Sequence, residues 1–270
     1  MPRVPDEFLE CVVYVYESVE DARGARRGGG TGFLVQWLVD DTVNLAVNYV
    51  VTNSHVAKKA EAIRVNTIDG GNNVISISPE QWIHHQAGDD IAIAPIGLSP
   101  DRFRYKVLPA RFFLNKAEIE ELNVGPGDDV YFMGRFVTLD GKQRNQPVVR
   151  FGSIAMMPGE PIHQKDREFD QESFLIEARS WSGFSGSPVM LHIPPFSNRF
   201  KTGKFEADDH GLRAETTTAL LGIHWGSICL GGGLVTNTGF IAVVPVWKLS
   251  ELLDSSEVVD RRRGLAEAVD

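Results

Sequence analysis

Three short segments of the chain carry a hydroxyl, an imidazole and a carboxylate that together could perform acyl transfer. Ser185 lies in the segment Gly-Phe-Ser-Gly-Ser-Pro at 183–188, His55 lies in the run VVTNSHVA, and Asp90 precedes the apolar run IAIA. A serine hydroxyl is a weak nucleophile until a base removes its proton, and histidine suits that role because imidazole titrates near neutral pH. A carboxylate under the ring would fix its tautomer and stabilise the imidazolium. We therefore predict Ser185 as nucleophile, His55 as general base and Asp90 as the residue that orients the base.

The residues around Ser185 also predict donors for the negatively charged oxygen of an acyl-transfer intermediate. Gly183 lets the backbone turn its N–H group toward that oxygen, and the N–H group of Ser185 is the second donor. Each segment alone also fits an ordinary role: a Gly/Ser turn, a structural histidine, or an acidic turn before a strand. Their combination favours catalysis, because 35 residues separate His55 from Asp90 and 95 separate Asp90 from Ser185. This spacing places base and acid in one β unit and the nucleophile in the next.

The elements that must position these residues are short apolar runs separated by Gly, Asn and Asp, a pattern typical of all-β proteins. We expect an N-terminal β unit over 1–110 that carries His55 and Asp90, and a C-terminal β unit over 111–254 that carries Ser185 and the substrate pocket, with an insertion at 193–218. The helical spacing of VWKLSELL predicts a short C-terminal helix over 246–253, followed by a frayed tail over 255–270. The predicted strands are 11–16, 32–39, 43–52, 62–65, 74–77, 91–96, 129–132, 147–156, 173–178, 188–191, 219–225 and 240–244.

In this order the motifs resemble the trypsin-like (chymotrypsin-fold) serine peptidases, in a bacterial-type intracellular form. The resemblance is colinear from about residue 8 to residue 254 and rests on the segments 30–33, 52–57, 90–93, 183–188 and 221–226. It implies two six-stranded antiparallel β-barrels packed together with the active site between them, hydrolysis of peptide bonds through an acyl-enzyme, and no cofactor. The last segment is similar to the family's strand that lines the primary substrate pocket, which implies that His224, Trp225 and Gly226 bind substrate.

The residues just before Ser185 bear on activation and on specificity. Phe184 replaces the acid that, in digestive members of the family, pairs with a newly cut N-terminus, so activation through that ion pair is not expected. Arg179 and Trp181 are expected near the pocket floor. Arg179 there would favour an acidic residue before the scissile bond, whereas Trp181 would make the pocket shallow and favour small side chains. The sequence leaves this choice open.

Composition narrows the classes of partner. The 270-residue chain has a net charge of −9, which argues against a nucleic-acid partner because such proteins usually present a basic surface. No run of about 18 apolar residues is present, so no membrane partner is expected. Two cysteines in apolar runs, interpreted as buried free thiols, and a start without a visible signal peptide indicate a cytoplasmic protein. His84 and His85 are expected as a loop or surface pair, and no metal site is predicted, because adjacent strand residues point to opposite faces.

A polypeptide substrate is therefore the expected partner, and a regulatory protein is a second one. The enzyme could stay latent until such a partner or a ligand orders the site, because oxyanion donors act only when they are positioned in advance. The alternative is a non-catalytic binding module on the same fold, in which the cleft and the insertion at 193–218 bind a partner without turnover.

Overall fold

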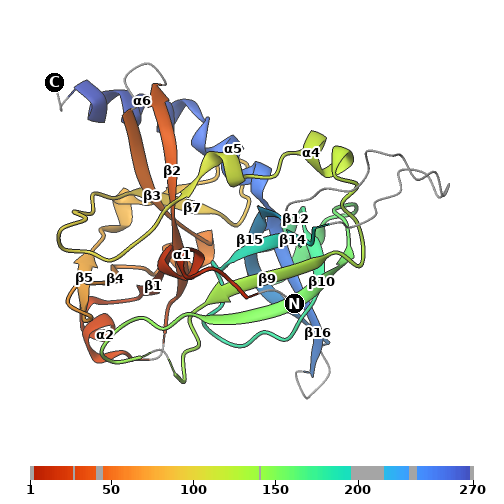
Figure 1. Cartoon of the computed structure of the whole chain (residues 1–270), viewed down its shortest axis with the longest axis horizontal. Coiled ribbons are helices and arrows are strands. Elements are labelled where there is room, and N and C mark those ends of the chain that lie inside the picture. Colours follow the sequence, from red (N-terminus) through yellow and green to blue (C-terminus); the bar gives the residue numbers. More distant parts are fainter. Residues whose placement is uncertain are drawn as a thin grey trace.

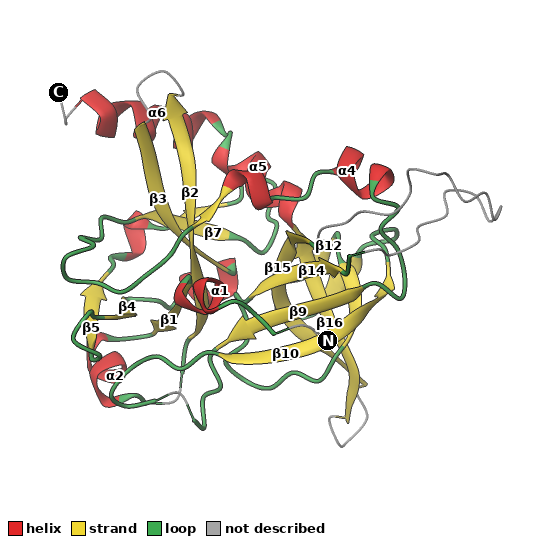
Figure 2. Cartoon of the chain, viewed as in Figure 1, coloured by secondary structure: helices red, strands yellow, loops and turns green. Residues whose placement is uncertain are grey.

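Two β units lie side by side in the structure, a computed structural model that describes residues 3–26, 28–40, 45–139, 141–195, 216–230 and 236–267 (Figure 1). The first unit is coloured red to orange and the second green to blue, and strands form most of both (Figure 2). The predicted all-β fold class is thereby confirmed only in part, because the chain is mostly β but also contains helices. Most of the predicted insertion at 193–218 lies outside the described residues.

The first unit is an open sheet. Its strands follow the order β5-β4-β1-β2-β3-β7-β6, and the short β8 pairs in parallel with β2. Among the described residues, the edge strands β5 and β6 do not pair with each other, and β6 offers only two residues for a ladder. The 3-10 turn η1 (Pro79–Gln81) lies between these two strands in the chain. The strands are β1 (Val12–Tyr16), β2 (Gly30–Asp40), β3 (Leu45–Thr52), β4 (Ala62–Asn66), β5 (Asn72–Ser76), β6 (Ile83–His84), β7 (Ala92–Pro95) and β8 (Leu108–Pro109).

The second unit is a closed barrel of six antiparallel strands in the order β10-β13-β16-β15-β14-β9. The prediction of two six-stranded barrels is thus confirmed for this unit only. A separate two-stranded hairpin, β11 (Ile162–Gln164) with β12 (Phe169–Gln171), lies between β10 and β13 in the sequence and outside the barrel. The barrel strands are β9 (Asp129–Gly134), β10 (Val148–Met156), β13 (Phe174–Glu177), β14 (Pro188–Ile193), β15 (Thr217–Leu230) and β16 (Thr236–Pro245).

The C-terminal region contains more helix than predicted. The expected helix is α5 (Val246–Leu253), which buries Val246, Leu249, Leu252 and Leu253. The residues expected as a frayed tail form a second helix, α6 (Ser256–Glu267), held by buried Val258 and by Arg262, whose guanidinium lies 5.9 Å from the Trp37 ring centroid. The remaining helices and turns are α1 (Asp6–Glu10), α2 (Val19–Gly24), α3 (Ser54–Ala57), α4 (Lys116–Glu121) and the 3-10 turn η2 (Ala110–Phe112).

One hydrophobic core joins the two units. It contains Val35 of β2 from the first unit and Leu220 of β15 from the second, with Phe113 of the connecting segment between them. Phe113 and Leu220 form a parallel β-bridge, and the next residue, Leu114, donates its N–H group to the Leu220 carbonyl at 3.1 Å. The segment after η2 is therefore fixed to the barrel, and the faces that carry the predicted site residues are held against each other.

Both cysteines are free, but only one is buried. Cys11 is buried as predicted, whereas Cys229 is exposed. Cys229 lies near the end of β15, beyond the residues that pair with β14, where the β15–β16 hairpin extends past the other strands of the barrel. Of the helices that the structure describes, none has the length and apolar character needed to cross a membrane.

Candidate active site

His55 and Asp90 lie together, as predicted. His55 is the second residue of α3, directly after β3, and Asp90 ends the loop before β7. One Asp90 oxygen, Oδ2, is 2.7 Å from His55 Nδ1, and the other, Oδ1, accepts the His55 main-chain N–H group at 3.0 Å. The Asp90 carbonyl in turn accepts from Asn53 Nδ2 at 2.8 Å. The Asp90 side chain is 1% exposed and the His55 side chain 38% exposed, so the acid is buried while the imidazole reaches the surface.

Asp90 is buried and nevertheless ionised. Burial alone raises the pKa of this carboxyl, but the hydrogen bond and charge of His55, together with the Arg167 guanidinium, bring its pKa below the ordinary value. The Arg167 NH1 atom is 3.5 Å from Asp90 Oδ1. An ionised Asp90 accepts the Nδ1–H group of His55, which leaves Nε2 free to take a proton from a nucleophile.

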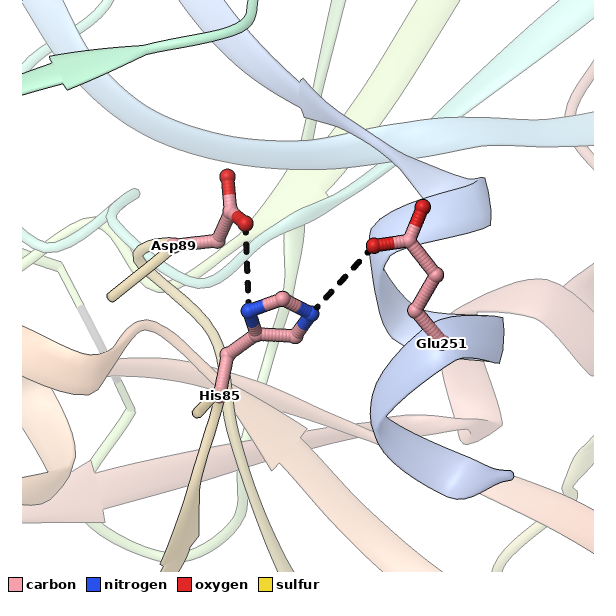
Figure 3. Close-up of side chains that lie close together, drawn as sticks. All are labelled: His85, Asp89 and Glu251. Carbon is pink, nitrogen blue, oxygen red and sulfur yellow. Dashed lines mark ion pairs between the residues drawn. The ribbon is translucent and has the colours of Figure 1, made fainter. Parts of the chain in front are cut away.

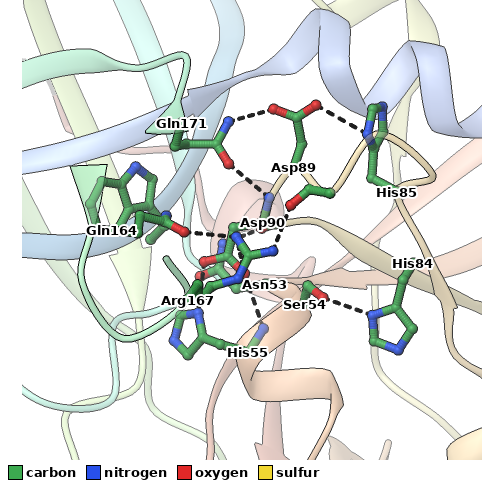
Figure 4. Close-up of polar contacts among 12 residues, drawn as sticks. Asn53, Ser54, His55, His84, His85, Asp89, Asp90, Gln164, Arg167 and Gln171 are labelled. Atoms are coloured by element: carbon green, nitrogen blue, oxygen red, sulfur yellow. Dashed lines mark hydrogen bonds and ion pairs between the residues drawn. The ribbon is translucent and has the colours of Figure 1, made fainter. Parts of the chain in front are cut away.

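The β11–β12 hairpin of the second unit completes the surroundings of Asp90 (Figure 4). Gln171 Oε1 accepts the main-chain N–H group of Asp90 at 2.8 Å, and Gln171 Nε2 donates to Asp89 Oδ1 at 2.6 Å. Neither Gln171 nor Arg167 is predicted as a site residue from the sequence. No local pattern could have revealed such a role, because Gln171 and Asp90 are 81 residues apart in the chain.

The nucleophile segment is a tight turn that is held to the first unit. The Ser185 carbonyl accepts the main-chain N–H group of Thr31 in β2 at 2.8 Å. Gly186 has a φ of +89°, and a Cβ atom there would collide with the Thr31 carbonyl, so glycine is required. The Phe184 side chain is fully buried, and its ring meets that of Phe132 edge-on with 5.5 Å between centroids. Apolar packing of Phe184 thus holds this turn.

Two main-chain donors of this turn have no acceptor in the part of the chain that the structure describes. They are the N–H groups of Gly183 and Ser185, the two predicted oxyanion donors. Gly183 has a φ of +101°, a conformation that residues with a side chain rarely adopt. Both groups are therefore available to an oxygen atom of a bound molecule.

The Ser185 hydroxyl is not directed at the base. Ser185 Oγ donates to the Trp225 carbonyl at 3.3 Å, and no hydrogen bond between Ser185 and His55 occurs among the described residues. The structure therefore brings the three predicted residues into one region but joins only His55 and Asp90.

The predicted substrate-binding residues differ in their exposure. Trp225 is half-buried against the barrel core, and its Nε1 atom donates to Ser173 Oγ at 3.0 Å. Gly226 is half-buried. Trp181 is 63% exposed and Arg179 is exposed as well, so neither side chain forms a pocket floor. An exposed tryptophan four residues before Ser185 is placed to contact a ligand at the rim of the site.

His224 is buried behind the nucleophile turn. Its ring stacks on Phe132 with 5.7 Å between centroids, and its Nδ1 atom lies 3.0 Å from the Phe184 carbonyl. Burial, opposed by this hydrogen bond, lowers the pKa of His224 to about 4. The imidazole is therefore neutral at pH 7 and donates from Nδ1 to the carbonyl directly before Ser185. Since the side chain is 2% exposed, only its main chain could contact a substrate.

A second group of ionisable residues adjoins Asp90 from the opposite side. His85 lies in the loop after β6, which fits one of the two predicted alternatives, but its side chain is buried. Its Nδ1 atom is 3.1 Å from Asp89 and its Nε2 atom 3.6 Å from Glu251 of α5. Figure 3 shows the ring between the two carboxylates, one nitrogen facing each. Lys248 Nζ is 3.7 Å from Asp89 and 3.2 Å from Glu251. Lys248 contacts both carboxylates and the ring lies between them, so these residues form a polar bridge from the Asp90 loop to α5.

His84, the neighbour of His85, faces α3. Its Nδ1 atom is 2.8 Å from the Ser54 hydroxyl, and burial together with the charges of Lys58 and Arg167 lowers its pKa below the ordinary value. The two histidines thus point to opposite sides, as adjacent strand residues must. Each of them supports one side of the loop that carries Asp90.

Comparison with known proteins agrees with this arrangement. A family model described as a trypsin-like peptidase domain matches residues 30–192, more than half of the chain. Among solved structures, the chain is similar to the MamO protease domain from Magnetospirillum magneticum in its apo form, with 17% identity, a TM-score of 0.56, and coverage of 92% of this chain and 98% of that chain. No curated protein sequence matches the chain.

The chain is also similar to an HtrA-type protease, AlgW, solved with a tripeptide. The identity is 17% and the TM-score 0.50, and the match covers 94% of this chain but 62% of that chain. A variant of AlgW with a tripeptide gives 15% identity and a TM-score of 0.51 over the same shares of both chains. At these identities the structural likeness establishes the fold alone.

Proposed function

Because the chain belongs to the trypsin-like peptidase family, we propose that it is a serine endopeptidase in which Ser185 is the nucleophile, His55 the general base and Asp90 the residue that orients the base. The observation that carries this proposal is the two-point contact of one buried carboxylate with His55, at 2.7 Å to the ring and 3.0 Å to the main chain. This contact fixes both the position and the tautomer of a ring that remains 38% exposed. A purely structural histidine has no need of a free nitrogen at the surface.

In the proposed reaction the same groups act in two stages, formation of the acyl-enzyme and its hydrolysis. Ser185 Oγ forms a bond to the peptide carbonyl carbon while His55 Nε2 takes the hydroxyl proton, and the carbonyl electron pair moves to oxygen. The N–H groups of Gly183 and Ser185 stabilise that oxyanion, a contribution of about 10²–10³ in rate per donor in such sites. Collapse of the intermediate breaks the C–N bond, and His55 gives its proton to the leaving amine. Water then releases the acyl group by the same steps.

The resting serine suggests how activity is controlled. Ser185 Oγ donates a hydrogen bond to the Trp225 carbonyl. The hydroxyl must exchange this bond for one to His55 before the reaction begins. We propose that substrate or a regulatory protein partner that occupies the main chain of β15 releases the hydroxyl toward His55. The substrate class is a polypeptide, which contacts the exposed Trp181 and Arg179 and the main chain at 224–226. A cytoplasmic location is proposed as well, supported by the two free cysteines.

Covalent labelling tests the proposal directly. Purified wild-type protein, Ser185→Ala and Ser187→Ala are treated with a fluorescent fluorophosphonate and resolved on a gel. Ser187 is the matched control, since it lies two residues from Ser185 but is fully buried. We expect wild type and Ser187→Ala to be labelled and Ser185→Ala to remain unlabelled. Equal labelling of all three proteins, or none with polypeptide substrates present, counts against the proposal.

The position of the Ser185 hydroxyl favours one alternative function, a non-catalytic binding module. In that case the cleft would bind a polypeptide, and the Ser185–Trp225 hydrogen bond would be its permanent state. Peptide-array binding distinguishes the two. A binding module gives wild type and Ser185→Ala the same bound peptides and leaves every peptide intact, whereas a peptidase cleaves peptides that Ser185→Ala only binds.

A further inference from the structure

The β11–β12 hairpin contacts the proposed catalytic acid although it belongs to the other unit. In the chain it connects two strands of the closed barrel, yet its turn residue Arg167 reaches the first unit, where NH1 lies 3.5 Å from Asp90 Oδ1. Gln171, at the end of β12, accepts the Asp90 main-chain N–H group. The hairpin therefore supplies a positive charge to the Asp90 carboxylate and a fixed partner to its backbone.

The Arg167 side chain is held in place from several sides. Its NH1 atom donates to Gln164 Oε1 at 2.7 Å, and its NH2 atom donates to the Gly88 carbonyl at 2.6 Å. The guanidinium carbon lies 5.3 Å from the centroid of the Phe169 ring, and the side chain is 15% exposed. A surface arginine that met Asp90 by chance would not have two further acceptors and an aromatic partner.

We propose that Arg167 is a positioning residue of the Asp90–His55 pair, and that the β11–β12 hairpin sets the pH range in which His55 acts as a base. The inference rests on the proposed peptidase function. Neither the triad motifs nor the match to the family model assigns this role to the hairpin.

The physical reason is a three-charge arrangement. Asp90 alone favours the protonated imidazole of His55, which keeps the base occupied at mildly acidic pH. The Arg167 charge opposes this, because a cation beside the carboxylate reduces the attraction that a proton on His55 experiences. Arg167 also keeps Asp90 ionised, since its charge helps to lower the pKa of that carboxyl against the effect of burial. We therefore expect that loss of the Arg167 charge would make protonation of His55 more favourable.

Other charged or titratable groups near the pair come from both units and from α5. His224 of β15 interacts with His55, and His84 of β6 interacts with Asp90, Lys58 and Arg167. Asp89 is bridged to His85 and Lys248 on the far side of the loop. Among these groups Arg167 is the cation placed on the Asp90 carboxylate itself, so its removal has the largest effect on His55.

Three variants of the full chain test the inference. Arg167→Met removes the charge and keeps a long apolar stem, Arg167→Lys keeps the charge, and Lys165→Met removes an equal charge from an exposed position on the same turn. The readout is the second-order rate of inactivation by a fluorophosphonate as a function of pH, which needs no known substrate. Thermal melting confirms that each variant is folded.

We expect the acid limb of the inactivation profile to move up by about 1 pH unit in Arg167→Met. It should stay within about 0.2 unit of wild type in Arg167→Lys and Lys165→Met, since both leave a cation at position 167. A loss of packing alone would lower the rate at every pH and would not move the limb. An unmoved limb in Arg167→Met, or an equal shift in Lys165→Met, overturns the inference.

A second measurement separates this inference from the proposed function. The imidazole resonance of His55 is followed by NMR against pH in Ser185→Ala, with and without Arg167→Met, and is assigned by its loss in His55→Gln. A higher titration midpoint without Arg167 supports the inference even if no fluorophosphonate ever reacts. If wild type is labelled but the His55 titration midpoint does not change without Arg167, the proposed peptidase function is supported and the proposed role of the hairpin is wrong.

Discussion

The Thr31 hydroxyl donates a hydrogen bond to the Gly183 carbonyl at 2.7 Å, which joins β2 of the first unit to the turn before the nucleophile. The same oxygen accepts the main-chain N–H group of Arg135 at 2.9 Å. Thr31 is fully buried, so water cannot replace either bond. One side chain of the first unit therefore fixes the peptide group between Gly183 and Phe184, which lies between the two predicted oxyanion donors.

Replacing Thr31 by valine should weaken the attachment of this turn, while the side chain at position 31 keeps a similar shape. Thr31→Val removes both hydrogen bonds, and we expect about 1–3 kcal/mol less unfolding free energy and a fluorophosphonate labelling rate at least about 10-fold lower. Thr31→Ser keeps the hydroxyl and should label at nearly the wild-type rate. Urea denaturation and labelling time courses measure both effects. Wild-type labelling by Thr31→Val would show that the turn is held by other contacts.

Removing the charge of Asp90 should abolish most activity without changing the fold. In Asp90→Asn the amide can no longer accept the Nδ1–H group as a carboxylate does, so the base loses its tautomer and its counter-charge. The rate of labelling should fall by about 10⁴. Asp170→Asn is the matched control, because the Asp170 side chain is 71% exposed and contacts His163 instead. Comparable losses in the two variants would mean that the Asp90–His55 contact has no special role.

The low pKa of His224 predicts a loss of stability in mild acid. Burial lowers this pKa to about 4, whereas an unfolded histidine titrates near ~6.5. As the pH falls from about 6.5 to about 4, the unfolded chain therefore binds a proton that the native protein excludes, and the unfolding free energy drops by up to about 3 kcal/mol. Below the pKa of native His224, both the native and the unfolded chain carry this proton, so His224 causes no further fall in the unfolding free energy.

The comparison with His224→Phe isolates this effect. Phenylalanine keeps a ring packed against Phe132 but cannot bind a proton. Between pH 6.5 and 4, the unfolding free energy of His224→Phe should therefore fall by about 3 kcal/mol less than that of wild type. Urea denaturation at several pH values measures the slope. His163→Gln is the control, since the His163 side chain is 49% exposed and its removal should leave the slope unchanged. Parallel slopes for wild type and His224→Phe would contradict the prediction.

The parts of the fold and site that could be predicted from the sequence are those with local causes. Alternating and continuous apolar runs located most strands, and the glycines around Ser185 predicted a turn whose φ values only glycine adopts readily. The pairing of His55 with Asp90 followed from two strand-end motifs in neighbouring strands, since β3 and β7 pair directly. These features depend on residues close in sequence or on an ordinary strand ladder.

The features that escaped prediction have causes distant in the chain. Closure of the first sheet depends on whether the edge strands β5 and β6 meet, which no single segment encodes. Helix α6 has little apolar periodicity of its own and is fixed by tertiary contacts such as that of Arg262 with Trp37. Arg167 reaches Asp90 only because the barrel carries the β11–β12 hairpin across to the other unit. Such contacts become visible only when the elements are assembled.

The last prediction concerns Phe184, which stands where digestive relatives carry an acid. Its ring is fully buried and packs edge-on against Phe132, so it holds the nucleophile turn by apolar contact. Phe184→Ala should lower the unfolding free energy by about 3–5 kcal/mol and slow labelling, because the cavity lets the Gly183–Ser185 turn move. Phe184→Leu fills most of the space and should lose about 1–2 kcal/mol. Phe184→Asp should be less stable than Phe184→Leu, because it loses the ring packing against Phe132 and buries a carboxylate in its place. The Arg150 guanidinium lies 5.9 Å from the Phe184 ring centroid. Urea denaturation ranks the variants, and an aspartate variant as stable as the leucine variant would show that Arg150 pairs with the new carboxylate.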